Sequence, residues 1–168
     1  MSIGRRAWIV FGFVLVVTFV FDQGSKAWAN TLPLHERQVV VEGYWDWQLA
    51  KNPGAAFSSF VGGTGLQILL GVVAVIALIV IGVMASRTRD EQRLTRLGLA
   101  MVAGGALGNL VDRIRDGAVT DFIRWHWHEH DWPIFNVADA ALLVGAVLLL
   151  VDGVRNSPRW KGRGMVRA

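Results

Sequence analysis

The sequence contains no cysteine, and this absence excludes both a disulfide framework and a thiol nucleophile. It also lacks internal repeats and low-complexity tracts. Charged residues are almost absent from four stretches, which are residues 7–21, 65–84, 97–111 and 137–151. A soluble domain does not normally bunch its apolar residues in this way.

Hydrophobic residues make up 53% of the 168-residue chain, which has room for one domain. With their flanks, the four apolar stretches approach the roughly 20 residues that an α-helix needs to cross a bilayer. We therefore expect an all-α membrane protein that forms a single integral-membrane domain over residues 1–168. The four expected transmembrane helices cover approximately residues 7–28, 64–85, 95–114 and 136–154.

The first apolar stretch has features of a secretory signal, because Arg5 and Arg6 precede it. However, no small-x-small cleavage site follows it cleanly, and Asp22 and Lys26 extend it as a helix. We therefore expect this stretch to stay in the protein as a membrane anchor.

The basic residues behind the net charge of +4 are concentrated in the N-terminal segment, in residues 87–96 and in the tail after residue 154. In a protein with four spans, these three segments lie on the same side of the membrane, and the positive-inside rule makes that side cytoplasmic. Both termini are therefore expected in the cytoplasm. Because topology accounts for the basic residues, we expect no nucleic-acid partner.

Two connections lie outside the cytoplasm in this topology. The first, residues 31–63, mixes valine, tyrosine and tryptophan with polar residues between Gln38 and Leu49, which favours short strands near the membrane surface. The second is expected as a loop or helix before the fourth span. Six tryptophans fall on this outer side, as in an interfacial aromatic belt: Trp28, Trp45, Trp47, Trp125, Trp127 and Trp132.

Small residues recur every four positions in the third span, at Ala100, Gly104 and Gly108. This spacing predicts that another helix approaches closely there.

Polar residues gather at the outer ends of three spans. Charged groups in a membrane helix are costly, so they tend to face a cavity or a partner and to mark function. Their spacing places Asn109, Asp112 and Arg113 on one helix face and pairs Asp22 with Lys26. The residues concerned are Asp22, Lys26, Asn109, Asp112, Arg113, Asn136 and Asp139.

Asp121 follows the third span, and we expect it to meet Asp139. Two carboxylates in a desolvated site do not both ionise readily, so the pair holds one proton. The ionised member can then activate water while the protonated member polarises a peptide carbonyl. Alternatives remain at this point, because Asp121 could be an ordinary loop acid and Asp139 could stabilise a helix N-terminus.

Five segments resemble the bacterial lipoprotein signal peptidase family, also called signal peptidase II. They occur in the family's order and cover nearly the whole chain between the termini. Thr120, Ala140 and Leu142 depart from residues common in the family, without removing a group from the proposed chemistry. The five segments are DQGSK (22–26), KNPGAAF (51–57), GGALGNLVDR (104–113), GAVTDFI (117–123) and FNVAD (135–139).

This resemblance implies an aspartic endopeptidase of the bacterial cytoplasmic (inner) membrane, with its active site near the outer leaflet. Its substrates would be diacylglyceryl-modified prolipoproteins, cut before the lipidated cysteine, and cyclic peptides would inhibit it. The implied fold is four helices with a small extracytoplasmic β cradle at residues 31–63. We expect contact with membrane lipid, a monomer, and no cofactor or metal.

The resemblance also assigns roles to individual residues. It implies that Asp121 and Asp139 are the catalytic dyad and that Asp22 and Lys26 form a structural pair. Residues implied to bind substrate or support the site are Asn52, Gly54, Asn109, Arg113 and Asn136. Loop architecture is an alternative role for Asn52 and Gly54, and charge compensation is one for Arg113.

Two further functions compete with peptide hydrolysis. A proton-coupled transporter would need polar groups through the whole membrane depth, whereas the second and fourth spans have none deep inside. A non-catalytic scaffold would explain the glycines but not the pairing of Asp121 with Asp139. The alternate histidines His126, His128 and His130 suit a metal site, but exposed interfacial histidines are the commoner case.

Overall fold

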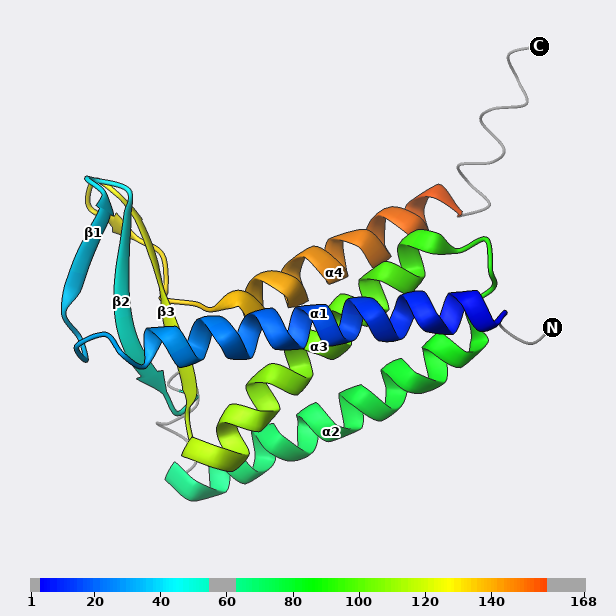
Figure 1. Cartoon of the computed structure of the whole chain (residues 1–168), viewed down its shortest axis with the longest axis horizontal. Helices are drawn as coiled ribbons and strands as arrows, with labels where there is room; N and C mark the ends of the chain where they lie inside the picture. Colours follow the sequence, from blue (N-terminus) through cyan, green and yellow to red (C-terminus); the bar gives the residue numbers. More distant parts are fainter. Residues whose placement is uncertain (1–3, 55–62, 157–168) are drawn as a thin grey trace, which may run out of the picture.

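The computed structural model describes residues 4–54 and 63–156 and consists of four long helices with a small sheet at one end (Figure 1). Within these residues, all four helices are long and apolar enough to cross a membrane. This confirms the expected fold class. The helices are α1 (Arg5–Ala29), α2 (Gly63–Arg87), α3 (Arg93–Asp116) and α4 (Val137–Arg155).

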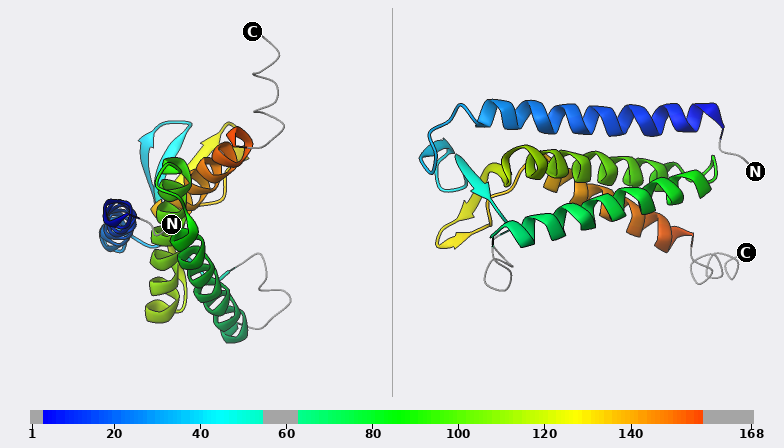
Figure 2. Two further views of the ribbon diagram at one scale, coloured as in Figure 1. Left: turned by 90° about the vertical axis from the view of Figure 1, so that its right-hand side faces the viewer. Right: turned by 90° about the horizontal axis from the view of Figure 1, so that it is seen from below.

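Helix α3 is the central helix, because it packs against each of the other three. Within an apolar stretch of 18 residues, 56% of the residues of α3 are buried. The corresponding share is 11% in α1 and 11% in α2. Two further views show α1 lying along one side of the group formed by α2, α3 and α4 (Figure 2). Residues on α3 can therefore contact both α1 and α4.

Glycines on α3 allow this close packing, as the small-residue spacing predicted. A Cβ at Gly104 would lie 2.7 Å from the Cβ of Thr18 on α1, and one at Gly108 would overlap the carboxylate of Asp22. A Cβ at Gly105 would lie 2.6 Å from the carbonyl oxygen of Ala138 on α4. The backbone of α3 thus approaches both neighbours at the depth where the polar residues lie.

The sheet has four antiparallel strands in the order β1-β2-β3-β4. Its strands are β1 (Arg37–Val41), β2 (Trp45–Asn52), β3 (Val119–Trp127) and β4 (His130–Asp131). In the register of β2 and β3, Ala50 pairs with Asp121 and Asn52 pairs with Val119. The sheet therefore joins the two outer connections, which are separated in sequence by α2 and α3.

The segment before the fourth span differs from the expected loop or helix, because it supplies β3 and β4 to the sheet. Val119 and Phe122 are almost fully buried in β3, which explains why a segment rich in β-branched and aromatic residues pairs with β2. Only the first part of the sheet, at β1 and β2, lies where the sequence indicated strands.

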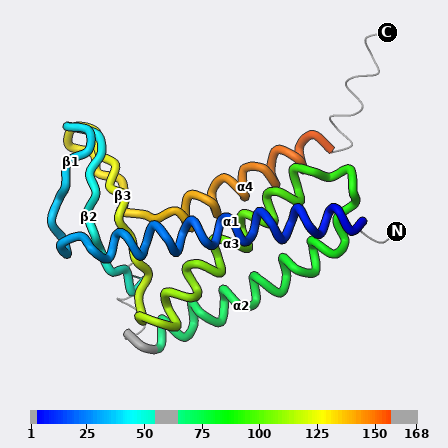
Figure 3. Tube along the Cα trace, viewed as in Figure 1, coloured from blue at the N-terminus to red at the C-terminus, as the bar shows by residue number. Residues whose placement is uncertain are grey.

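The two described chain ends lie together at the end of the molecule opposite the sheet, as the trace shows (Figure 3). Arg5 begins α1 and Arg155 ends α4 at this end. Asp22, Lys26, Asn109, Asp112 and Asp139 lie nearer the other end, where β3 and the start of α4 contact the helices.

Candidate active site

Two aspartates from separate elements lie at the junction of the sheet and the helices. Asp121 is on β3, and Asp139 is in the first turn of α4. Three asparagines surround them: Asn52 at the end of β2, Asn109 on α3, and Asn136 at the N-cap of α4. The structure therefore brings together, from four elements, most of the site residues expected from the sequence.

Asp121 is buried and accepts a hydrogen bond on each carboxylate oxygen. Asn136 Nδ2 donates to its Oδ1 at 2.7 Å, and Asn52 Nδ2 donates to its Oδ2 at 2.9 Å. Burial is the main reason that the pKa of Asp121 is raised to about 6, with a further rise from the charge of Asp139. The amide donors and the charge of Lys26 act in the opposite direction. Such a carboxyl exchanges its proton near neutral pH.

Asp139 belongs to a capping box at the start of α4. Its backbone N–H donates to Asn136 Oδ1 at 2.9 Å, and its Oδ2 accepts from the backbone N–H of Asn136 at 3.2 Å. Its other oxygen, Oδ1, accepts from Asn109 Nδ2 at 2.9 Å. Asp139 is half-buried, and its carboxyl group both caps α4 and accepts a hydrogen bond from α3.

Asn136 connects the two aspartates. Its amide nitrogen donates to the carboxylate of Asp121, and its backbone N–H donates to that of Asp139. Asn136 therefore holds the two carboxyl groups near each other, and the charge of Asp139 adds to the rise that burial causes in the pKa of Asp121.

Gly54 fixes the orientation of Asn52. Its backbone N–H donates to Asn52 Oδ1 at 2.9 Å, which leaves Asn52 Nδ2 directed at Asp121. Gly54 has φ = +94°, and a Cβ there would lie 2.7 Å from Leu70 Cδ1 on α2. Both its conformation and its contact with α2 therefore require glycine.

Arg113 lies one turn beyond Asn109 on α3. Its guanidinium donates to the backbone carbonyl of Asn109 at 3.1 Å. Among the neighbouring carboxylates, its charge interacts most strongly with Asp139. The described contacts place a positive charge beside the aspartates, where a substrate carbonyl or a developing negative charge could approach.

Asp22 and Lys26 form the ion pair that their spacing indicates, at 2.9 Å. Lys26 also pairs with Asp112 on α3 at 3.1 Å and donates to Asn109 Oδ1 at 2.8 Å. We call Asp22, Lys26 and Asp112 the Lys26 cluster; all three side chains are almost fully buried. Asp22 Oδ1 also accepts the backbone N–H of Ala138 at 2.8 Å, which ties α1 to the start of α4.

Two contributors to this network were not found from the sequence. Gln23 Nε2 lies between α1 and α3, donating to Asp22, to the Gly108 carbonyl and to Asp112. The backbone N–H of Thr120 donates to Asp112 Oδ2 at 3.0 Å, which links α3 to β3. The position of Gln23 next to Asp22, inside a membrane span, could have indicated its role from the sequence. The role of the Thr120 backbone N–H could not, because every residue type except proline has such a donor.

The histidine-rich segment lies away from the aspartates, on β3 and β4. His126 Nε2 lies 3.3 Å from Asp46 Oδ2, and Arg124 on β3 pairs with both Asp46 and Asp131. Within residues 4–54 and 63–156, acidic and histidine side chains form no group of three or more that could hold a metal ion.

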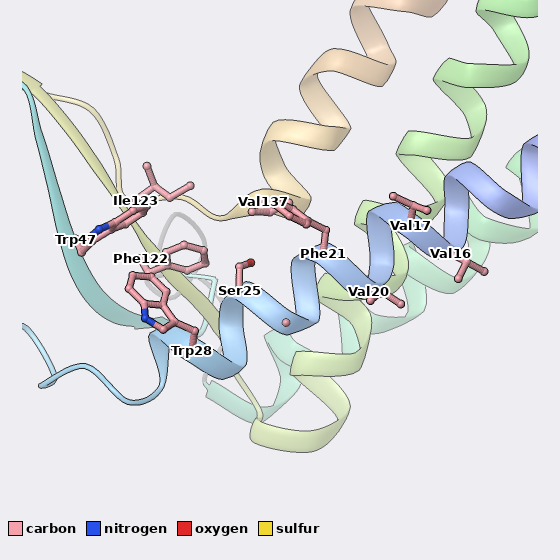
Figure 4. Close-up of a pocket in the computed structure, with 11 residues that line it drawn as sticks. Val16, Val17, Val20, Phe21, Ser25, Trp28, Trp47, Phe122, Ile123 and Val137 are labelled. Carbon is pink, nitrogen blue, oxygen red and sulfur yellow. The ribbon is translucent and has the colours of Figure 1, made fainter.

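An apolar groove of about 860 Å³ runs along α1 and ends at the sheet. Figure 4 shows Trp28, Trp47 and Phe122 gathered where β2 and β3 meet the end of α1. Successive strand residues point to opposite faces, so Phe122 lines the groove while the neighbouring Asp121 faces Asn52 and Asn136. Ile123, which follows Phe122 in β3, also lines the groove, as does Val137 next to Asn136, so the groove lies beside the site.

This arrangement supplies the groups for acid–base chemistry on a polar bond. It contains a carboxyl that titrates near neutral pH, a second carboxyl on a half-buried residue, and three amides that hold both in place. One of the carboxyls can hold a proton while the other accepts one from water.

A family model described as Signal peptidase (SPase) II, in the peptidase A8 group, matches residues 14–155. The chain is 42% identical over 152 residues to a lipoprotein signal peptidase of Pseudomonas putida, covering 89% of this chain and 87% of that one. It is 38% identical over 151 residues to one from Geobacter metallireducens, covering 89% and 93%. A lipoprotein signal peptidase of Xanthomonas euvesicatoria is 39% identical over 160 residues, covering 92% and 91%.

Two solved structures described as bacterial membrane enzymes share the fold. One has a TM-score of 0.80 at 26% identity, covering 88% of this chain and 94% of that one, and the other has 0.79 at 25%, covering 89% and 90%. The residues matched by the family model, 14–155, include Asp121 and Asp139. From its sequence and its fold, this bacterial multi-pass membrane protein belongs to the signal peptidase II family of lipoprotein signal peptidases, which are aspartic peptidases.

Proposed function

We propose that this protein removes the signal peptide from diacylglyceryl-modified prolipoproteins by cleaving before the lipidated cysteine. Asp121 and Asp139 act as the dyad. The ionised carboxyl takes a proton from water, the water oxygen attacks the scissile carbonyl carbon, and the protonated carboxyl donates to the carbonyl oxygen. The tetrahedral intermediate then collapses, the peptide C–N bond breaks, and the leaving nitrogen takes a proton from the dyad.

The observation that carries this proposal is the shared contact with Asn136. This residue donates to Asp121 at 2.7 Å and to Asp139 at 3.2 Å. A pair held in this way, with the pKa of Asp121 raised to about 6, supports one shared proton near neutral pH. We propose that the substrate and the dyad are held in place by three further residues, Arg113, Asn52 and Gly54.

The proposed orientation has both termini in the cytoplasm and the dyad near the outer leaflet. Basic residues at the end opposite the sheet support it, including Arg5, Arg6, Arg93 and Arg155. In this orientation the acyl chains of a substrate stay in the bilayer while its peptide reaches the dyad from the membrane surface.

The test is cleavage of a synthetic lipidated precursor peptide by the purified protein, followed by mass spectrometry of the products. Asp121→Asn and Asp139→Asn should each slow cleavage by about 100- to 10,000-fold, because each removes one proton-transfer group. The matched control is Glu91→Gln, which neutralises an exposed acid between α2 and α3 and should cleave normally. Cleavage at the wild-type rate by either aspartate variant would refute the dyad.

Inhibition and oligomeric state give two further checks. We propose that a cyclic-peptide inhibitor binds at the dyad, so that either asparagine substitution weakens its binding. We also propose that the monomer is active, because every proposed site residue comes from one chain. Activity of a size-fractionated monomer in detergent would support this, and activity confined to an oligomeric fraction would contradict it.

A further inference from the structure

Three asparagines donate an amide N–H to the dyad, and each has its amide oxygen held by another donor. The backbone N–H of Gly54 holds Asn52, and the backbone N–H of Asp139 holds Asn136. The ammonium of Lys26 holds Asn109. An amide presents an acceptor on one side and donors on the other, so the group that holds the oxygen decides where the nitrogen points. Asn136 Nδ2 also donates to Asn109 Oδ1, at 3.2 Å, but the bond from Lys26 is the shorter one, at 2.8 Å, and carries a charge.

Lys26 can hold Asn109 in only one orientation. Its ammonium has three N–H donors and no acceptor, and three oxygens lie within 2.8 to 3.1 Å of it, on Asn109, Asp22 and Asp112. The side chain is 1% exposed, so water does not compete for these bonds. Asn109 must therefore turn its oxygen to Lys26 and its nitrogen to Asp139 Oδ1, which accepts at 2.9 Å.

A reversed Asn109 would oppose the proposed chemistry. Its amide oxygen would then face Asp139 Oδ1, and two acceptors in contact repel unless the carboxyl is protonated. Asn136 Nδ2, which donates to Asn109 Oδ1 at 3.2 Å as well as to Asp121, would also lose one of its acceptors. The orientation of this single amide therefore affects both members of the dyad.

We propose that Lys26 is a positioning residue of the dyad, which sets the amide of Asn109 so that Asp139 receives a hydrogen bond in its ionised form. The inference rests on the proposed function of Asp121 and Asp139. It extends the role of Lys26 beyond its pairing with Asp22, because the ion pairs could form without any contact to Asn109.

The charge of Lys26 supports the same conclusion. Asp121 is faced by Asp139, by the amides of Asn52 and Asn136, and at longer range by Lys26 and Arg113. The ammonium lowers the pKa of Asp121 against the effects of burial and of Asp139. Loss of Lys26 should therefore let the dyad keep its single proton to higher pH, and the alkaline limb of the rate profile should move upward.

The experiment uses the full chain in detergent micelles with the synthetic lipidated peptide. Lys26→Met alone would leave two buried carboxylates without their cation, so it is combined with Asp112→Asn, which keeps the net charge of the Lys26 cluster. Asp112→Asn alone is the matched control. Relative to this control, the double variant should show about 10- to 100-fold lower kcat, with KM changed less than about threefold. Its alkaline limb should lie about one pH unit higher.

A merely structural role for Lys26 gives a different result. Partial misfolding lowers the fraction of active enzyme, which reduces the rate equally at every pH. An alkaline limb that stays where it is in Asp112→Asn would therefore overturn the inference. Lys26→Arg provides a rescue, since a guanidinium also only donates; its alkaline limb should stay near that of the wild type.

A second variant decides the question if the double variant does not fold. Asn109→Asp keeps an acceptor for Lys26 but places an acceptor against Asp139, which imitates the reversed amide. Because the added carboxyl is buried beside Asp139, the variant should be checked for folding by thermal unfolding, and the folded protein should lose about 10- to 100-fold in kcat. Wild-type kcat in this variant would overturn the inference. Failure of the wild type to cleave the peptide would instead refute the proposed function.

Discussion

Two clusters in this molecule have the same composition, one cation between two carboxylates, but different surroundings. The Lys26 cluster joins α1 to α3, and all of its side chains are 1% exposed or less. The second cluster, which we call the Arg124 cluster, contains Asp46, Arg124 and Asp131 and joins β2, β3 and β4. In it, Asp131 is 59% exposed.

The difference shows what burial and a third contact add to an ion pair. Arg124 donates at 2.7 Å to Asp46 and also to Asp131, and these bonds hold neighbouring strands together. Lys26 uses its third N–H for Asn109, which in turn contacts the dyad. Charges alone therefore do not distinguish a cluster that holds a sheet from one that reaches the active site.

Removal of Asp22 should have the largest effect. Asp22→Ala takes away a buried partner of Lys26 and the acceptor for the backbone N–H of Ala138. Breaking a buried pair from one side costs about 3–5 kcal/mol, so thermal unfolding in micelles should shift markedly downward and cleavage should fall with it. The comparison is Asp131→Ala in the Arg124 cluster, which should unfold almost as the wild type does. Equal shifts for both variants would show that burial does not separate the clusters.

Gly108→Ala should disturb the Lys26 cluster without removing a charge. The added methyl group would overlap the carboxylate of Asp22, so α1 must move away from α3. Overpacking of this kind costs about 1–3 kcal/mol. Gly12→Ala on α1 is the matched control, because a Cβ there meets no atom of the described residues within 4 Å. Chemical denaturation of both variants in the same detergent measures the difference, and equal stability would contradict this account of Gly108.

The pH dependence of cleavage should sharpen the comparison further. Because the pKa of Asp121 is about 6, the dyad loses its single proton above that value, and kcat should fall about tenfold per pH unit on the alkaline side. Asp131→Asn should leave this limb unchanged, because the Arg124 cluster does not contact the dyad. A shifted limb in this variant would indicate that the two clusters are coupled through β3.

The smallest expected effect concerns the Arg124 cluster itself. The hydrogen bond from Arg124 lowers the pKa of Asp131 from its ordinary value of 3.8. A carboxyl with a lowered pKa contributes stability above its ordinary pKa and loses it as the pH falls through the lowered value. Amide exchange in β3 and β4 should therefore speed up slightly below about pH 3.8, and Asp131→Asn should abolish that change. Exchange that stays equally pH-dependent in the variant would assign the effect to another group.

Part of this architecture could be predicted from the sequence because it is local. Long charge-free stretches indicated the four helices, and the spacing of Asp22 and Lys26 indicated their ion pair. The small residues at Gly104 and Gly108 likewise indicated a close helix contact. Each of these features depends on residues within one helix, where geometry is fixed by hydrogen bonds to nearby residues.

Contacts between elements could not be predicted in the same way. Spacing within α3 gives no sign that Asn109 contacts Lys26 on one side and Asp139 on the other. Strand β3 was missed because β-strand formation depends on the neighbouring strand as much as on the residues themselves. The residues implied by family resemblance do lie around the two aspartates, but their roles in catalysis stay predictions until the variants are measured.

The pairing of β2 with β3 has a consequence for how the enzyme is made. Asn52 precedes α2, Asp121 follows α3, and Asp139 begins α4. During synthesis, a chain that has emerged only as far as α3 possesses the first of these groups but neither aspartate. If Asp121 and Asp139 act together as proposed, the site is complete only once the chain has been made as far as the first turn of α4.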